Sequence, residues 1–211
     1  RTSLVNASGA SAWPPYSNVQ EGVHRDVDVL MLYPLDLVAV EERFGSWMSQ
    51  YAYANYVTQA KLLERGQVVD GAIEMAARRF TTLVAEFEPF PSRELLEMMQ
   101  QLANSGGRVI WSGPPPVLGA DGKPVLDRWQ QLFGADYTPR HGEGLSAPGK
   151  LITFEGSLAG IAPMTVLTDF VVDRVYPVTP HEGTESIACL LEGVSPLSFK
   201  CSTGASPVNS G

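Results

Sequence analysis

The side chains in this 211-residue chain that could do chemistry are few and far apart in the sequence. Glu86 and Ser112 each stand at the end of an apolar, β-branched run, and His181 lies in a loop flanked by prolines. Tyr53 belongs to a group of aromatic residues in a predicted helix. Strand ends and loops are where α/β folds usually hold their ligands. These four residues are therefore candidate ligand or interface contacts.

Carboxylate pairs are the first chemistry to consider. A glycosidase needs two carboxyl groups about 5 to 10 Å apart across a sugar. Glu86 and Glu88 flank the end of the run at 80–87, and Asp169 and Asp173 share a later predicted strand. Such pairs are common in any sequence and do not by themselves predict hydrolysis. Glu86 is the best of them for ligand contact, and a surface or helix-capping role is the alternative.

Ser112 ends the strand in "GGRVIWSGPPP", residues 106–116. A nucleophile on a sharp strand-to-helix turn needs small neighbours and a backbone N–H aimed at the oxyanion. Proline has no N–H, and three prolines follow Gly113, so this stretch does not suit such a turn. Ser112 could act as a nucleophile with His141 or His181 as its base, but nothing in the sequence positions either histidine. The simpler interpretation is a strand end, and we predict no catalytic residue.

His181 and Glu182 could bind a metal or a sugar hydroxyl, and a solvated loop is the alternative. Aromatic residues at near-helical spacing could form a sugar platform or a subunit contact, and these are Trp47, Tyr51, Tyr53 and Tyr56. Only part of such a stripe can be core, and Tyr53 is the member expected to lie outside it. The sequence predicts neither a metal centre nor a cofactor.

The two cysteines, Cys189 and Cys201, lack metal-ligand spacing. If their runs form a hairpin around residues 192–196, Cys189 faces a residue near 198 or 199, and a bridge to Cys201 is out of register. We therefore expect two buried free thiols.

Composition limits the classes of partner. Hydrophobic residues make up 44% of the chain, enough for a substantial core, and the net charge is −8. The fifteen basic residues are scattered, so no surface for nucleic acid is expected. No apolar run reaches the roughly 20 residues that a membrane span needs, and no membrane partner is expected. An arginine at position 1 leads us to expect a piece of a longer chain.

Hydrophobic periodicity predicts the elements. Strands are expected at 27–34, weakly at 68–73, at 80–87 and at 108–113, with helices at 46–66, 92–106 and 125–134. This alternation predicts a mostly parallel sheet with helices on its faces, a flavodoxin-like three-layer sandwich. After Gly134, short β-branched runs separated by Gly and Pro predict a β-rich, antiparallel part. The expected organisation is an extended arm at 1–26, an α/β core at 27–140 and a β-rich continuation at 141–211.

The order of these signals resembles a known family. It runs from "DVLMLYP" through "LLERGQVVDGAI" and "RFTTLVAEFEPFPSRELLEMMQQLANSGGRVIWSGPPP" to "RWQQLFG". Together they resemble the class I glutamine amidotransferase-like domain beside the catalytic barrel of family 42 β-galactosidases and related bacterial glycoside hydrolases. In the β-galactosidases it is called the trimerisation domain. The resemblance covers roughly residues 27–137, and "DFVVDRVYPVTPHEGTESIACLLEG" resembles the β-rich tail of such domains.

The resemblance implies a non-catalytic accessory domain of a glycoside hydrolase that serves subunit association or shapes the neighbouring active site. The hydrolytic carboxyl pair would belong to the barrel, and the partners would be that barrel and further copies in a dimer or trimer. Carbohydrate is a candidate ligand. The alternatives are a free-standing hydrolase or amidotransferase-like enzyme with a displaced nucleophile or metal site, and a sugar-binding domain in which tyrosines and Glu86 line one groove.

Overall fold

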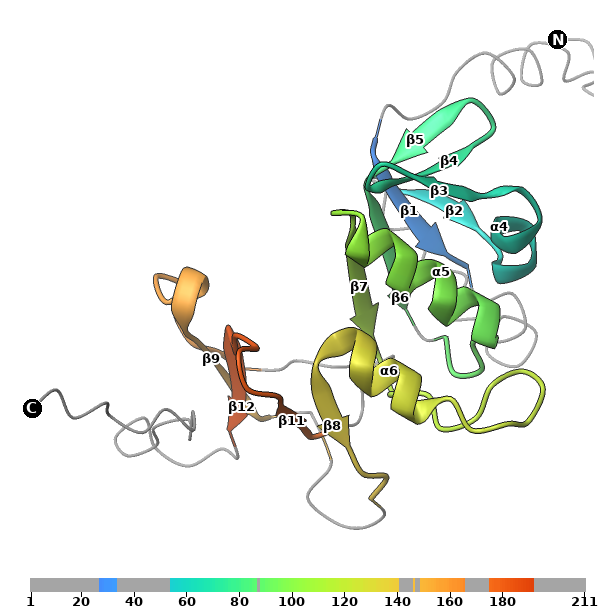
Figure 1. Ribbon diagram of the computed structural model, residues 1–211. Coiled ribbons are helices and arrows are strands. Elements are labelled where there is room, and N and C mark those ends of the chain that lie inside the picture. Colours follow the sequence, from blue (N-terminus) through green and yellow to red (C-terminus); the bar gives the residue numbers. More distant parts are fainter. Residues whose placement is uncertain are drawn as a thin grey trace, which may run out of the picture.

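The computed structural model describes residues 27–33, 54–86, 88–140, 146, 149–165 and 175–191. They form a mixed α/β protein with one parallel four-stranded sheet and several antiparallel sheets (Figure 1). The α/β part and the antiparallel part predicted from the sequence are both present. No helix among the described residues is long and apolar enough to cross a membrane.

The parallel sheet has the strand order β2-β1-β6-β7. Its strands are β1 (Val29–Leu32), β2 (Asn55–Val57), β6 (Thr82–Glu86) and β7 (Arg108–Ser112). All three pairings are parallel. The carboxyl ends of the four strands therefore meet at one edge of the sheet, and β7 lies at its border.

Helices cover one face of this sheet. Figure 1 shows α5 (Arg93–Asn104) lying across the strands, with α4 (Gln59–Arg65) beside β2 and α6 (Leu126–Phe133) near the end of β7. As predicted, Ser92 caps α5, its side chain accepting a hydrogen bond from the Leu95 N–H at 3.1 Å. Gly134 ends α6 in the left-handed conformation.

The parallel sheet separates two hydrophobic clusters, one on each of its faces. Leu30, Leu32, Leu83 and Ala85 point toward the helices, where they join Leu62 of α4 and Leu95, Leu96, Met99 and Leu102 of α5. On the opposite face Met31, Ala54 and Val84 form a smaller cluster, with Val29 and Tyr33 packed against it. This division follows from the alternation of side chains along a strand.

The predicted helix at 46–66 is wrong in part. Within its described residues, 55–57 form strand β2, and the helix α4 begins at Gln59, capped by Thr58. The aromatic and β-branched residues Tyr56 and Val57 suit a strand, and the pairing of β2 with β1 overrides the helical spacing. Residues 46–53, with Trp47, Tyr51 and Tyr53, lie outside the described residues.

The weak strand predicted at 68–73 is an antiparallel hairpin. Strands β3 (Gln67–Val69) and β4 (Ala72–Met75) flank Asp70 and Gly71, both with positive φ. These two residues form the turn rather than an irregularity within one strand. A third strand, β5 (Arg78–Phe80), pairs with β4 and leads into β6.

The last third of the described chain is antiparallel, as predicted. Strand β8 (Ala135–Tyr137) pairs with β11 (Val178–Pro180), and β9 (Leu151–Phe154) pairs with both β10 (Met164–Thr165) and β12 (Ala188–Leu191). A 3-10 turn, η1 (Gly156–Leu158), follows β9. Among the described residues after Ala135, none is buried. Figure 1 shows β9 and β12 to one side of the α/β part.

The prediction of free thiols is wrong. Cys189 is disulfide-bonded, and Cys201, the other cysteine of the chain, lies outside the described residues. We expected free thiols because a hairpin between the run containing Cys189 and the run after residue 196 would put a bridge to Cys201 out of register. Within the described residues, β12 pairs with β9, and Cys189 stands opposite Thr153. The disulfide at Cys189 overturns that expectation.

Candidate functional site

Glu86 and Ser112 lie side by side at the carboxyl edge of the parallel sheet. They are the last residues of β6 and β7, and the ladder places them in register. Partners in register on parallel strands present their side chains on the same face. Residues 26 positions apart in the sequence thus meet at the edge where open α/β sheets hold ligands.

Glu86 is buried, with 8% of its surface exposed. Desolvation by this burial raises the pKa of the Glu86 carboxyl from its usual 4.5 to about 7. The Oε2 atom is buried and has no hydrogen-bond partner in the part of the chain that the structure describes. A carboxyl group in this state holds its proton up to neutral pH and can both donate and accept a hydrogen bond.

Two tyrosines share this face of the sheet. Tyr33 directly follows β1 and packs against the cluster that contains Met31 and Val84. Tyr56 on β2 is in register with Met31 and therefore presents its ring on the same side. The two rings meet edge to face, with centroids 6.4 Å apart. The carboxyl edge of this face thus combines aromatic surface, a buried carboxyl and a hydroxyl.

The backbone after Ser112 does not form a nucleophile turn. Ser112 is not among the described non-glycine residues with positive φ, which are Asp70, Ala76 and Ala77. The next helix, α6, does not begin until Leu126. Gly113 has φ 107°, and the chain then turns so that the Trp111 indole N–H donates to the Pro114 carbonyl at 3.2 Å. No tight strand-to-helix turn directs the Ser112 hydroxyl outward.

His181 makes its contacts at β8 rather than at the carboxyl edge of the parallel sheet. Its Nε2 lies 2.9 Å from Oδ1 of Asp136 on β8, and that oxygen also accepts from the Gln130 amide at 3.2 Å. The backbone N–H of His181 donates to the Gly134 carbonyl at 2.8 Å. Within the described residues no hydrogen bond joins His181 to Ser112, so the structure does not bring these two candidates together.

The remaining candidates are less informative. Glu88 is buried to the same extent as Glu86. Tyr53, His141, Asp169 and Asp173 lie outside the described residues. Within the described ranges no three His, Cys, Asp or Glu side chains are grouped so that they could hold a metal ion.

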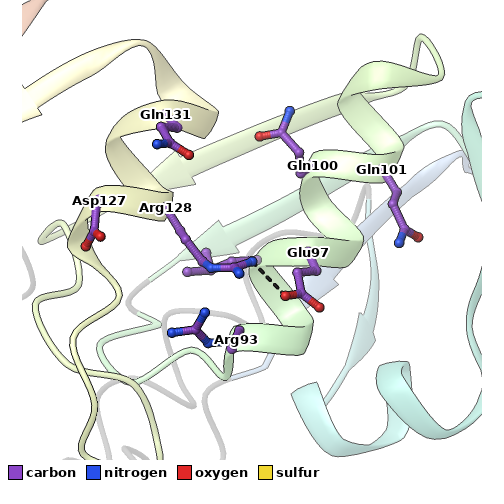
Figure 2. A pocket seen from close by; sticks show the side chains of 8 residues that line it. Arg93, Glu97, Gln100, Gln101, Asp127, Arg128 and Gln131 are labelled. Atoms are coloured by element: carbon purple, nitrogen blue, oxygen red, sulfur yellow. Dashed lines mark hydrogen bonds and ion pairs between the residues drawn. The ribbon is translucent and has the colours of Figure 1, made fainter.

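A groove of about 580 Å³ runs between α5 and α6. Figure 2 shows polar side chains from both helices around it, with Arg93 and Arg128 near Glu97. The Arg128 guanidinium of α6 donates to the Glu97 carboxylate of α5 at 2.7 Å. None of the four residues singled out from the sequence lines this groove.

Comparisons with known proteins give only distant similarity. No family model matches the chain, and none of the curated proteins matches it. Among solved structures, it is similar to a catalytic mutant of Gan42B, a GH42 β-galactosidase from G. stearothermophilus, with a TM-score of 0.48 and 10% identity. A second Gan42B structure gives a TM-score of 0.49 and 9% identity. In both cases 90% of this chain is covered but 29% of the other, so the chain spans less than a third of those enzymes.

Sequence reasoning found Glu86 and Ser112 but missed Tyr33. The signal was present, because Tyr33 precedes Pro34 at the end of the first predicted strand. Its relation to Glu86 depends on β1 and β6 being neighbours in the sheet, which periodicity does not reveal.

Proposed function

We propose that this chain is a non-catalytic accessory domain of a carbohydrate-active enzyme of the glycoside hydrolase type. It serves subunit association or shapes a neighbouring active site. In this proposal residues 27–140 form a flavodoxin-like, amidotransferase-type sandwich, 1–26 an arm, and 141–211 a β-rich part of the same domain. The sequence resemblance and the extended backbone at Ser112, which offers no strained nucleophile turn, support it.

The observation that carries the association role is the apolar face of the sheet β10-β9-β12. Ile152 is in register with both Met164 and Leu190, and Phe154 is in register with Ala188. Cross-strand partners share a face, and alternate residues of a strand do so too. The described strand residues on one face of this sheet are therefore all apolar.

This apolar face is open to solvent. Met164 is 54% exposed and Leu190 is 37% exposed. Contiguous exposed apolar surface on a folded protein typically marks an interaction site. We assign a second copy of this chain as the occupant, because the sequence resembles a trimerisation domain. A neighbouring catalytic barrel is the alternative occupant, and the test must distinguish it from a second copy.

Sedimentation velocity of the chain over a range of concentrations tests the assignment. We expect concentration-dependent association that Met164→Ser combined with Leu190→Ser shifts to monomer. Leu118→Ser is the matched control, since Leu118 is 42% exposed but lies outside this sheet. A wild-type chain that stays monomeric at the highest soluble concentration would contradict association through this face and favour the barrel as occupant.

A further inference from the structure

The carboxyl edge of the parallel sheet carries a set of side chains that the association role leaves unused. Tyr33, Tyr56, Glu86 and Ser112 lie on the face opposite α4 and α5, at or near the carboxyl ends of four neighbouring strands. This face is partly open, because Ile110, two residues before Ser112 on β7, is 44% exposed.

Glu86 is the group that points to a ligand. A buried polar atom without a partner costs free energy, and the great majority of such atoms in folded proteins are hydrogen-bonded. Within the described residues the Glu86 Oε2 has no partner although the side chain is more than nine-tenths buried. Ser112, its partner in register, adds a hydroxyl that can donate and accept.

We propose that Tyr33, Tyr56, Glu86 and Ser112 form a subsite for one unit of a neutral, hydroxyl-rich ligand, namely a sugar. The ligand's hydroxyls would bond to the Glu86 carboxyl and the Ser112 hydroxyl. Its apolar ring face would lie against the tyrosines. The choice of a sugar among hydroxyl-rich compounds rests on the proposed function.

The chemistry of the site favours an uncharged ligand. Burial raises the pKa of the Glu86 carboxyl to about 7, so below neutral pH it is mostly protonated and offers hydrogen bonds rather than a full negative charge. No Lys or Arg belongs to the set, so it offers no ion pair to an anion. The edge-to-face tyrosine pair supplies aromatic surface with phenol groups, which combines apolar contact with hydrogen bonding.

Amide chemical shifts in ¹H–¹⁵N spectra of the whole chain test this subsite. The probes are methyl β-D-galactopyranoside, methyl β-D-glucopyranoside and, as a polyol that is not a sugar, myo-inositol. We expect at least one glycoside to shift the amides at the ends of β6 and β7 in a saturable manner. Absence of saturable shifts with every probe would overturn the proposal.

Substitutions at Glu86 and Ser112 test whether these residues bind the glycoside. Glu86→Leu should abolish binding, Ser112→Ala should weaken it about fivefold through loss of one hydrogen bond, and Glu86→Gln, which keeps a donor and an acceptor, should retain it. Thr179→Ala, which removes an exposed hydroxyl from β11, is the control. Wild-type affinity in both Glu86→Leu and Ser112→Ala would overturn the site, as judged in variants whose spectra show a folded chain.

The outcomes separate this inference from the proposed function. Inositol bound as well as the glycosides would overturn the choice of a sugar. Saturable glycoside binding in a chain that never associates would support the subsite and contradict the association role. Association of a chain that binds no glycoside would support the association role and contradict the subsite.

Discussion

Gly107 lies directly against the carbonyl group of Gly71: a Cβ atom at position 107 would stand 2.7 Å from the Gly71 oxygen. Gly71 belongs to the turn between β3 and β4, and Gly107 immediately precedes β7. The hairpin therefore contacts the point where the chain leaves α5 and enters the parallel sheet. The glycine pair at 106–107 ends the helix and also makes room for a neighbouring backbone.

Gly107→Ala should destabilise the protein by about 1 to 3 kcal/mol, as overpacking typically does. The added methyl would also meet the Leu102 side chain, so neither neighbour can move away without disturbing α5 or the hairpin. Urea denaturation measures the change. Gly160→Ala is the control, since nothing lies within 4 Å of a Cβ there. Equal effects of the two substitutions would contradict the close approach.

Glu86 should make the protein less stable as the pH rises. In the unfolded chain its carboxyl ionises near 4.5, whereas in the native state its pKa is about 7. Between these values the native state holds a proton that the unfolded state has lost, so the free energy of unfolding falls with increasing pH. The stabilisation that Glu86 gives by staying protonated is fully present below pH 4.5 and fully lost above pH 7. It amounts to roughly 3 kcal/mol at most.

Glu86→Gln should remove this part of the pH dependence and raise stability at pH 8. Denaturant midpoints at pH 5 and pH 8 measure it. Glu182→Gln, at an exposed position, should leave the profile unchanged. A pH profile that Glu86→Gln does not flatten would show that the carboxyl is solvated or paired.

Ala77→Gly should stabilise the protein by about 0.5 to 1 kcal/mol. Ala76 and Ala77 join β4 to β5 with φ of 51° and 57°. The left-handed region costs a residue with a Cβ about 1 to 2 kcal/mol, and glycine loses part of that gain through its flexible unfolded state. Ala103→Gly within α5 should have the opposite sign. Thermal unfolding compares them, and a destabilising Ala77→Gly would contradict this turn.

The Arg128–Glu97 pair across the groove should contribute little to stability. Its side chains are 37% and 45% exposed, so water screens the attraction at 2.7 Å (Figure 2). A double-mutant cycle with Arg128→Ala and Glu97→Ala should give a coupling free energy below about 1 kcal/mol that decreases with salt. A coupling above about 2 kcal/mol would mean that the groove is desolvated in solution.

The sequence was most informative where local signals agreed. Strand β1, helix α5 and strand β7 fall where periodicity, the Ser92 cap and the glycines placed them. Strand β2 was missed because Tyr56 and Val57 fit a helical spacing too, and only pairing with β1 decides between the two. The expected free thiol at Cys189 was wrong because the hairpin register on which it depended was assumed from the sequence alone.

The candidate site was predictable in kind but not in composition. Glu86 and Ser112 could be singled out because each ends a recognisable strand. Their adjacency requires β6 and β7 to be neighbours, and the contact between Tyr33 and Tyr56 requires β2 to lie beside β1. The burial of Glu86 is a tertiary property that no local pattern encodes.

Burial among the described residues stops at Ala135, and the consequence should be visible in amide hydrogen exchange. Backbone amides of β6 and α5 sit in the core and should exchange only through global unfolding. The amides of β9 and β12 are bonded within their sheet, but no described residue of that sheet is buried, so they should exchange through local opening. Their protection should then rise when a partner covers that sheet, which would make exchange rates in β9 and β12 a direct reporter of assembly.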